Sequence, residues 1–167
     1  MNIEPSRVLA PPRFEDGKTM LIAGLSRRYS YKDMEEAFTG IPAQWQRIAP
    51  QLDRIPGRIG NISYGVCCNI IPGDGFRYLC GAEVADKFVL PNGFDTERLP
   101  AKRYAVFNHA DHISQIRNTI DAIWNKWLPQ SEYEPAGDFF IEHYGKSFDP
   151  QTGMGGVDIL VPVERHS

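Results

Sequence analysis

The order of expected secondary-structure elements repeats once along this 167-residue chain, and this repeat constrains the fold more than any other feature. An extended apolar run over residues 19–28 predicts a strand, and a helical stripe of apolar side chains follows it. Two β-type runs come next, residues 60–71 and 76–85, joined by the turn-forming sequence PGDG. After a polar connector the same order of elements begins again.

In the second half, residues 101–110 predict a strand, and Asp111 is a candidate cap for a helix that Pro129 ends. Residues 138–144 and 157–163 predict two more strands. The apolar stripe of this second helix consists of Ile113, Ile116, Ile120, Ile123, Trp124 and Trp127.

Two strand-helix-strand-strand modules predict an α+β fold with an antiparallel sheet, helices on one face and a central ligand cleft where the halves meet. The similar element order suggests a pseudo-twofold relation between the modules, at a period near 80 residues. We predict an N-terminal extension over residues 1–17 and a single domain over residues 18–167, whose modules span about residues 18–90 and 100–163.

The first helical stripe contains Pro42, which removes a backbone donor and clashes with the preceding turn inside a helix. We therefore expect two short helices here, with Pro42 in the first turn of the second. The stripe itself consists of Tyr31, Met34, Phe38, Ile41, Trp45 and Ile48.

The composition is that of an ordinary folded chain, with a formal net charge of −3 and 18 scattered Lys and Arg residues. Duplex DNA binding is therefore not expected. No signal peptide and no apolar run of about 18 residues is visible, so we expect cytoplasmic residence and no membrane partner. His109 and His112 lack an identifiable third ligand, and we predict neither a metal site nor a cofactor.

Glu142 is the most unusual residue of the predicted strands, because aromatic and apolar residues surround it in the sequence FFIEHY. Strand alternation places Phe140, Glu142 and Tyr144 on one face. Burying a carboxylate among aromatic side chains is costly unless a cation or hydrogen-bond donors meet it. An open pocket for an organic cation would offset that cost, whereas a solvent-facing glutamate on a half-buried strand is the alternative.

Several local sequences resemble one family, the GyrI-like small-molecule-binding domain. They include IPAQWQRI, ISYGVCCN, FRYLCGAEV, the segment IDAIWNKWLPQSEYEPAGDFFIEHY and the closing VDILVPV, and the resemblance extends from about Lys18 to Val163. This family is also known as the effector-binding domain of AraC-type regulators such as Rob, and is related to the drug-binding domain of BmrR. The resemblance implies an aromatic cleft between two modules with an acidic residue at its base, which falls on Glu142.

Regulators of this family carry a helix-turn-helix unit ahead of the sensor domain. Only about 18 residues precede the first predicted strand here, so we expect a stand-alone module.

The candidate ligand-binding residues are Glu142, as counter-charge, and Tyr64, Tyr78, Trp45 and Phe140, as walls of the cleft. The two tyrosines match aromatic positions of the family pattern, although core packing is an equally good interpretation of them. Core packing is also the alternative for Trp45, and it is the prediction for Trp124 and Trp127.

The predicted function is uptake of a lipophilic, cationic compound, and the predicted partner is thus a small hydrophobic or cationic ligand. One alternative is an enzyme that hydrolyses strained cyclopropyl electrophiles, with Glu142 as general acid or base. Another is a protein that interacts with DNA gyrase, as some family members do. We predict no catalytic residue and favour binding over catalysis; if the chain does catalyse a reaction, Glu142 must do most of the chemistry.

Overall fold

The computed structural model describes residues 9–86 and 89–166. All strand pairs in these residues are antiparallel, and the strand order is β1-β6-β9-β8-β3-β4-β2-β5, with β7 paired to β9. The strands are β1 (Arg13–Gly17), β2 (Met20–Ser30), β3 (Ser63–Ile71), β4 (Gly75–Val84), β5 (Asp95–Leu99), β6 (Lys102–His109), β7 (Tyr133–Pro135), β8 (Phe140–Tyr144) and β9 (Val157–Arg165). The helices are α1 (Met34–Ile48), the 3₁₀ helices η1 (Ala49–Arg54) and η2 (Ile113–Gln115), α2 (Ile116–Ala122), the π-helical turn η3 (Ile123–Trp127) and α3 (Leu128–Gln130).

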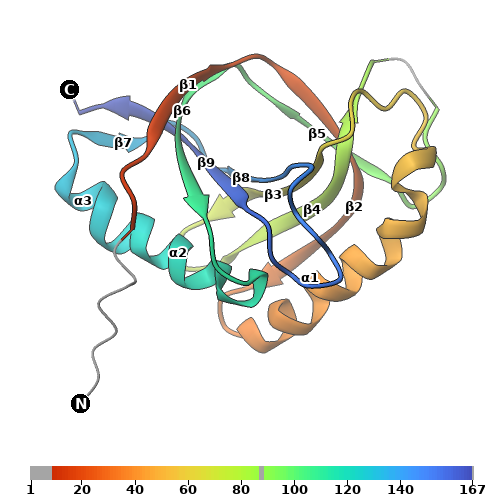
Figure 1. Ribbon diagram of the computed structural model, residues 1–167, viewed down its shortest axis with the longest axis horizontal. Coiled ribbons are helices and arrows are strands. Elements are labelled where there is room, and N and C mark those ends of the chain that lie inside the picture. Colours follow the sequence, from red (N-terminus) through yellow and green to blue (C-terminus); the bar gives the residue numbers. More distant parts are fainter. Residues whose placement is uncertain (1–8, 87–88, 167) are drawn as a thin grey trace.

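The predicted duplication is visible in the strand order. Counting outward from the central β8–β3 pair, β8, β9 and β6 lie on one side, and β3, β4 and β2 lie on the other in the equivalent order. Figure 1 shows α1 and α2 on the same side of the sheet. The α+β fold with its antiparallel sheet, paired modules and one helical face is therefore confirmed.

Residues 13–17, expected in the N-terminal extension, instead form β1 and pair with β6 of the second module. In the equivalent position, β5 precedes the second module and pairs with β2 of the first. The strand that precedes each module in the sequence therefore pairs with the other module. The sequence RFEDG did not predict a strand because three of its five residues are charged. Residues 1–8 of the expected extension lie outside the described residues.

The expected break at Pro42 is wrong, because α1 runs without interruption from Met34 to Ile48. Proline deprives the carbonyl of Phe38, four residues earlier, of its helical partner. Both residues are exposed, so water can hydrate that carbonyl. The opposite side of α1 is fixed by the buried Gln44, which donates to the backbone carbonyls of Leu25 and Tyr78. This anchoring compensates for the hydrogen bond lost at Pro42.

The second helical segment continues from Ile116 through the π-helical turn η3 to Gln130, so Pro129 lies inside the last turn. Pro129 is the second residue of α3, the short helix that follows the π-helical turn, and proline is common in the first turn of a helix. Among the described residues, no helix has the length and apolar character needed to cross a membrane.

The sheet has apolar residues on both faces, and strand alternation decides to which face each belongs. Cys67, Tyr78 and Phe140 lie on the face covered by the helices, within the larger core cluster. Tyr64 and Ile141 lie in a separate cluster on the opposite face. The helical face is therefore the one that carries the cleft residues.

Candidate functional site

A cavity of about 1410 Å³ lies between the two helical segments and the middle of the sheet. Its apolar lining comes from both modules, because the helical stripes predicted from the sequence turn toward this space as well as toward the sheet. From α1 it is lined by Met34, Phe38, Ile41 and Trp45, from α2 and η3 by Ile116, Ile120 and Trp124, and from the strands by Cys67, Phe76, Tyr78, Phe140, Glu142 and Tyr144.

Glu142 lies at the junction of the two modules, where β8 pairs with β3 and Glu142 is opposite Gly65. Glu142 is only 5% exposed. The predicted alternation is confirmed, since Phe140, Glu142 and Tyr144 line the cavity while Ile141 packs on the other face. The carboxylate thus lies on the inner surface of the cavity, at the junction about which the two modules are related.

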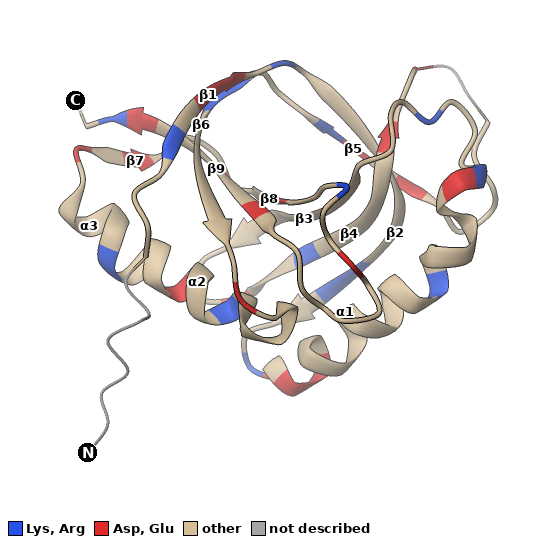
Figure 2. Ribbon diagram, in the orientation of Figure 1, with Lys and Arg blue, Asp and Glu red and all other residues tan. Residues whose placement is uncertain are grey.

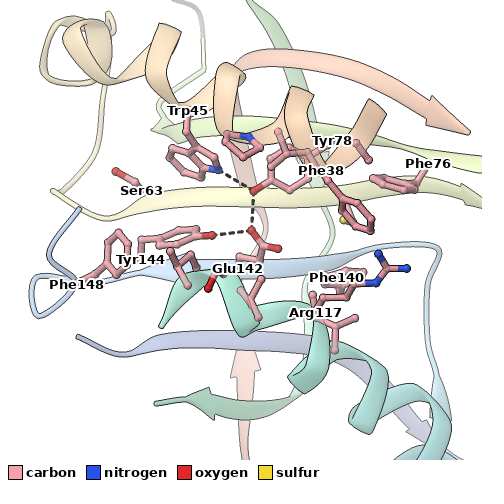
Figure 3. A pocket seen from close by; sticks show the side chains of 18 of the residues that line it. Phe38, Trp45, Ser63, Phe76, Tyr78, Arg117, Phe140, Glu142, Tyr144 and Phe148 are labelled. Atoms are coloured by element: carbon pink, nitrogen blue, oxygen red, sulfur yellow. Dashed lines mark hydrogen bonds between the residues drawn. The ribbon is translucent and has the colours of Figure 1, made fainter. Parts of the chain in front are cut away.

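The carboxylate is held by two phenols (Figure 3). The Tyr78 hydroxyl donates to Glu142 Oε1 at 2.6 Å, and the Tyr144 hydroxyl donates to the same oxygen at 2.9 Å. The indole Nε1 of Trp45 donates in turn to the Tyr78 hydroxyl at 3.0 Å. Both phenols use Oε1, and Oε2 has no hydrogen-bond partner among the described residues.

Burial raises the pKa of Glu142 above its ordinary value of 4.5, and the hydrogen bonds from Tyr78 and Tyr144 lower it in part. Burial, together with the charge of Glu142, raises the pKa of both phenols well above 10.0. Tyr78 and Tyr144 are therefore neutral donors at any physiological pH. Within the described part of the chain, no Lys or Arg side chain pairs with Glu142.

Gly65 makes this arrangement sterically feasible. A Cβ atom at this position would lie 2.6 Å from Glu142 Oε1 and would overlap the Tyr78 hydroxyl. Any larger residue would separate the phenol from the carboxylate. A glycine inside a strand often marks a close approach of this kind, and that is the one sequence signal that could have identified Gly65.

Aromatic rings form walls on both sides of the carboxylate. The rings of Trp45 and Tyr144 meet edge to face with centroids 4.9 Å apart, and those of Tyr144 and Phe148 do so at 5.1 Å. On the other side, Trp124 lies 4.9 Å from Phe140. The predicted residues Trp45, Tyr78, Phe140 and Glu142 are thus brought together around one cavity.

Trp124 packs against the core cluster, as expected, and it also lines the cavity from the π-helical turn. The predicted apolar stripe already contains Ile116, Ile120 and Trp124, whose 4-residue spacing puts all three on one side of the helix, and all three line the cavity. Trp127, by contrast, packs against Phe107 with ring centroids 5.0 Å apart, as expected for a core residue. Phe38, Phe76 and Phe148 also line the cavity and were not predicted.

Tyr64 is not part of the cavity. It lies on the opposite face of β3, 8% exposed, with its ring against His143 at a centroid distance of 5.5 Å. The neighbouring residues Ser63 and Cys67 face the cavity instead, as strand alternation requires. The expected role of Tyr64 as a wall therefore does not fit its position.

Arg117 of α2 and Phe38 of α1 meet near the cavity, with the guanidinium 4.4 Å from the ring centroid. Arg117 also lies 4.0 Å from the Asp121 carboxylate. Figure 2 shows basic and acidic residues interspersed along the helices and strands. Arg117 and Lys146 are the cationic residues among the described ones that line the cavity, and the guanidinium of Arg117 is already engaged by an aromatic ring and a carboxylate.

The model of the GyrI-like small molecule binding domain matches residues 10–164. The chain belongs to this family. The resemblance seen in the sequence is therefore confirmed, and the GyrI-like domain covers nearly all of the residues that the structure describes.

One curated relative of this GyrI-like chain is the transcriptional regulator BrlR of Pseudomonas aeruginosa, which is 31% identical over 121 residues. The match covers 71% of this chain and 44% of BrlR, so the chain spans less than half of that regulator.

Solved structures share the fold. SAV2435, in a structure described as bound to tetraphenylphosphonium, has a TM-score of 0.75 at 13% identity and covers 93% of this chain and 94% of its own. An integron cassette protein of Vibrio cholerae has a TM-score of 0.69 at 16% identity, covering 93% and 97%. The C-terminal domain of EcmrR has a TM-score of 0.62 at 16% identity, covering 92% and 97%.

Proposed function

We propose that this chain takes up a lipophilic organic cation in the cavity, with Glu142 as counter-charge and Trp45, Tyr78 and Phe140 as walls. One observation carries the proposal: Glu142 is only 5% exposed, its carboxylate opens onto an aromatic cavity, and it has no Lys or Arg partner among the described residues. An unpaired buried charge is costly, and a bound cation would remove that cost.

The walls suit such a ligand. Aromatic faces attract cations within about 6 Å of the ring centroid, and the attraction strengthens when water is excluded. The cavity of about 1410 Å³ exceeds the usual range for drug-sized ligands, about 300–1,000 Å³. A bulky cation with several apolar arms would fill this space better than a small one.

The relatives support the same proposal. SAV2435 has this fold and its structure is described with tetraphenylphosphonium, a bulky organic cation. BrlR is a transcriptional regulator, and the chain matches less than half of it, as expected if the shared part is an effector-binding domain.

Tetraphenylphosphonium is a suitable probe for calorimetry at neutral pH. We expect binding in the micromolar range to the parent chain and a loss of at least tenfold in Glu142→Gln, which keeps the shape but removes the charge. Glu83→Gln is the matched control, because Glu83 is another buried glutamate of the sheet, 9% exposed, and it does not line the cavity. Equal affinity of parent and Glu142→Gln would contradict the counter-charge.

The enzymatic alternative stays a prediction, with one observation in its favour. The sequence offered Glu142 without a partner, whereas the structure places the hydroxyls of Tyr78 and Tyr144 on it. A carboxyl group with a raised pKa beside two phenols is a reasonable general acid. Ring-opened product from a cyclopropyl electrophile, absent with Glu142→Gln, would distinguish catalysis from binding.

A further inference from the structure

We propose that this site selects cations that carry an N–H group, such as protonated amines, over quaternary cations of the same shape. The inference rests on the proposed function and deepens it, because it names the ligand class from the free oxygen of Glu142. Tetraphenylphosphonium would then bind in the cavity without donating a hydrogen bond to the carboxylate.

The two oxygens of Glu142 have different surroundings. Oε1 accepts from both Tyr78 and Tyr144, at 2.6 Å and 2.9 Å, while Oε2 accepts from neither. Figure 3 shows Oε2 directed away from both hydroxyls, on the side of the labelled Phe140. The phenols therefore fix the carboxylate plane and leave one oxygen presented to the cavity.

Oε2 is open to the cavity, and among the described residues no protein donor contacts it. A protonated amine can donate to it in a short charge-assisted hydrogen bond, with a nitrogen-to-oxygen distance of about 2.7–2.9 Å. A quaternary nitrogen has no proton to donate, and its alkyl groups hold the positive charge farther from the oxygen. Only the first class of ligand satisfies Oε2.

The aromatic walls do not make this distinction. The rings of Trp124 and Phe140 present faces and edges to a cation of either class, and their attraction depends on charge and contact distance. Arg117 is not a substitute donor, since Phe38 and Asp121 engage its guanidinium. Asp121, the other carboxylate among the described residues that line the cavity, already faces Arg117 at 4.0 Å, so we assign the preference for an N–H group to Oε2.

A matched pair of ligands tests the inference: protonated dibenzylmethylamine and the quaternary dibenzyldimethylammonium ion, which differ by one N-methyl group. Titration calorimetry at a pH where the amine is protonated gives an affinity ratio for each protein. We expect the parent chain to bind the protonated amine about tenfold to a hundredfold more tightly.

The protonated amine also loses more hydration on binding than the quaternary ion does. Because this difference is the same for every protein, the affinity ratio is compared between variants. Glu142→Gln places an amide NH₂ where Oε2 stood and should abolish the preference, whereas Glu83→Gln should keep it. A ratio that is the same in the parent and in Glu142→Gln overturns this inference and leaves the proposed function standing. Failure of both ions and of tetraphenylphosphonium to bind overturns the proposed function itself.

Discussion

Gly65 and Glu142 face each other across the β3–β8 pair, and the small size of the first decides what the second can contact. With hydrogen at position 65, the Tyr78 hydroxyl reaches Oε1 of Glu142 at 2.6 Å. The hydrogen bond to Tyr78 lowers a pKa that burial raises, and so keeps more of the carboxylate ionised near neutral pH. Gly65 therefore acts on ligand binding through Tyr78 and Glu142.

Gly65→Ala should weaken tetraphenylphosphonium binding about tenfold, because the added methyl group separates the phenol from the carboxylate. Loss of that hydrogen bond also raises the pKa of Glu142 further, so the pH at which binding appears should move upward. Calorimetry over a pH series measures both effects. Gly145→Ala is the control, since Gly145 also lines the cavity but an added Cβ would meet only His143, at 3.7 Å. Unchanged affinity and midpoint in Gly65→Ala would refute this role.

Glu142→Gln should make the chain more stable at neutral pH while weakening binding. The folded-state pKa of Glu142 is raised, so its stabilising contribution is complete below the unfolded pKa and is lost as pH rises through the folded value. Glutamine cannot ionise, so the variant does not lose this stability as the pH rises. We expect a gain of about 1 kcal/mol at pH 7.5 that vanishes near pH 4. Urea denaturation at both pH values measures the free energy of unfolding of the two proteins. A difference that is the same at both pH values would contradict a buried charge at Glu142.

At the scale of elements, the 3- and 4-residue spacing of apolar side chains predicted both helices, because that spacing follows from local helix geometry. It did not predict that α1 continues through Pro42 or that Ile123–Trp127 forms a π-helical turn. Both irregularities depend on partners outside the helix. Gln44 fixes α1 to β2 and β4, and Trp124 packs on Phe140 of β8.

Pro42→Ala should stabilise the chain, since α1 is continuous and alanine restores the missing hydrogen bond to the Phe38 carbonyl. Removing the proline relieves its cost inside a helix, but it also gives the unfolded chain more conformational freedom. We therefore expect the free energy of unfolding to rise by about 1–2 kcal/mol. The midpoint of urea unfolding measures it. Pro129→Ala is the control, because proline is tolerated in the first turn of α3, and it should change stability by less than about 0.5 kcal/mol. A loss of stability in Pro42→Ala would indicate a break at that position.

At the scale of the whole molecule, each module pairs with the strand that precedes the other module. β1 pairs with β6 and β5 pairs with β2, so neither module completes its edge without residues of its partner. The cavity is shared in the same way, with α1 on one side and α2 on the other. Cooperative unfolding of both modules follows from this exchange.

Phe14→Ala tests the exchange, because Phe14 of β1 packs against Tyr133 at 4.9 Å and Trp127 at 6.4 Å between ring centroids. Phe14 is only half-buried, so we expect a loss of about 2 kcal/mol, below the usual range for a core phenylalanine. Far-ultraviolet circular dichroism and tryptophan fluorescence should give one shared midpoint in urea. Separate midpoints for the two signals would show that the modules unfold independently.

The sequence by itself determined the element order, the duplication, and the common face of Phe140, Glu142 and Tyr144, because helix and strand periodicities are local properties of the backbone. Only the tertiary structure decided which of Tyr64 and Tyr78 reaches the carboxylate. Tyr78 faces the cavity and Tyr64 does not, since the register of β3 with β4 and β8 sets which side of the sheet each side chain occupies. Gly65 acquires its importance in the same way, from two side chains that arrive from other strands. Such pairings join residues far apart in the chain, and no local pattern encodes them.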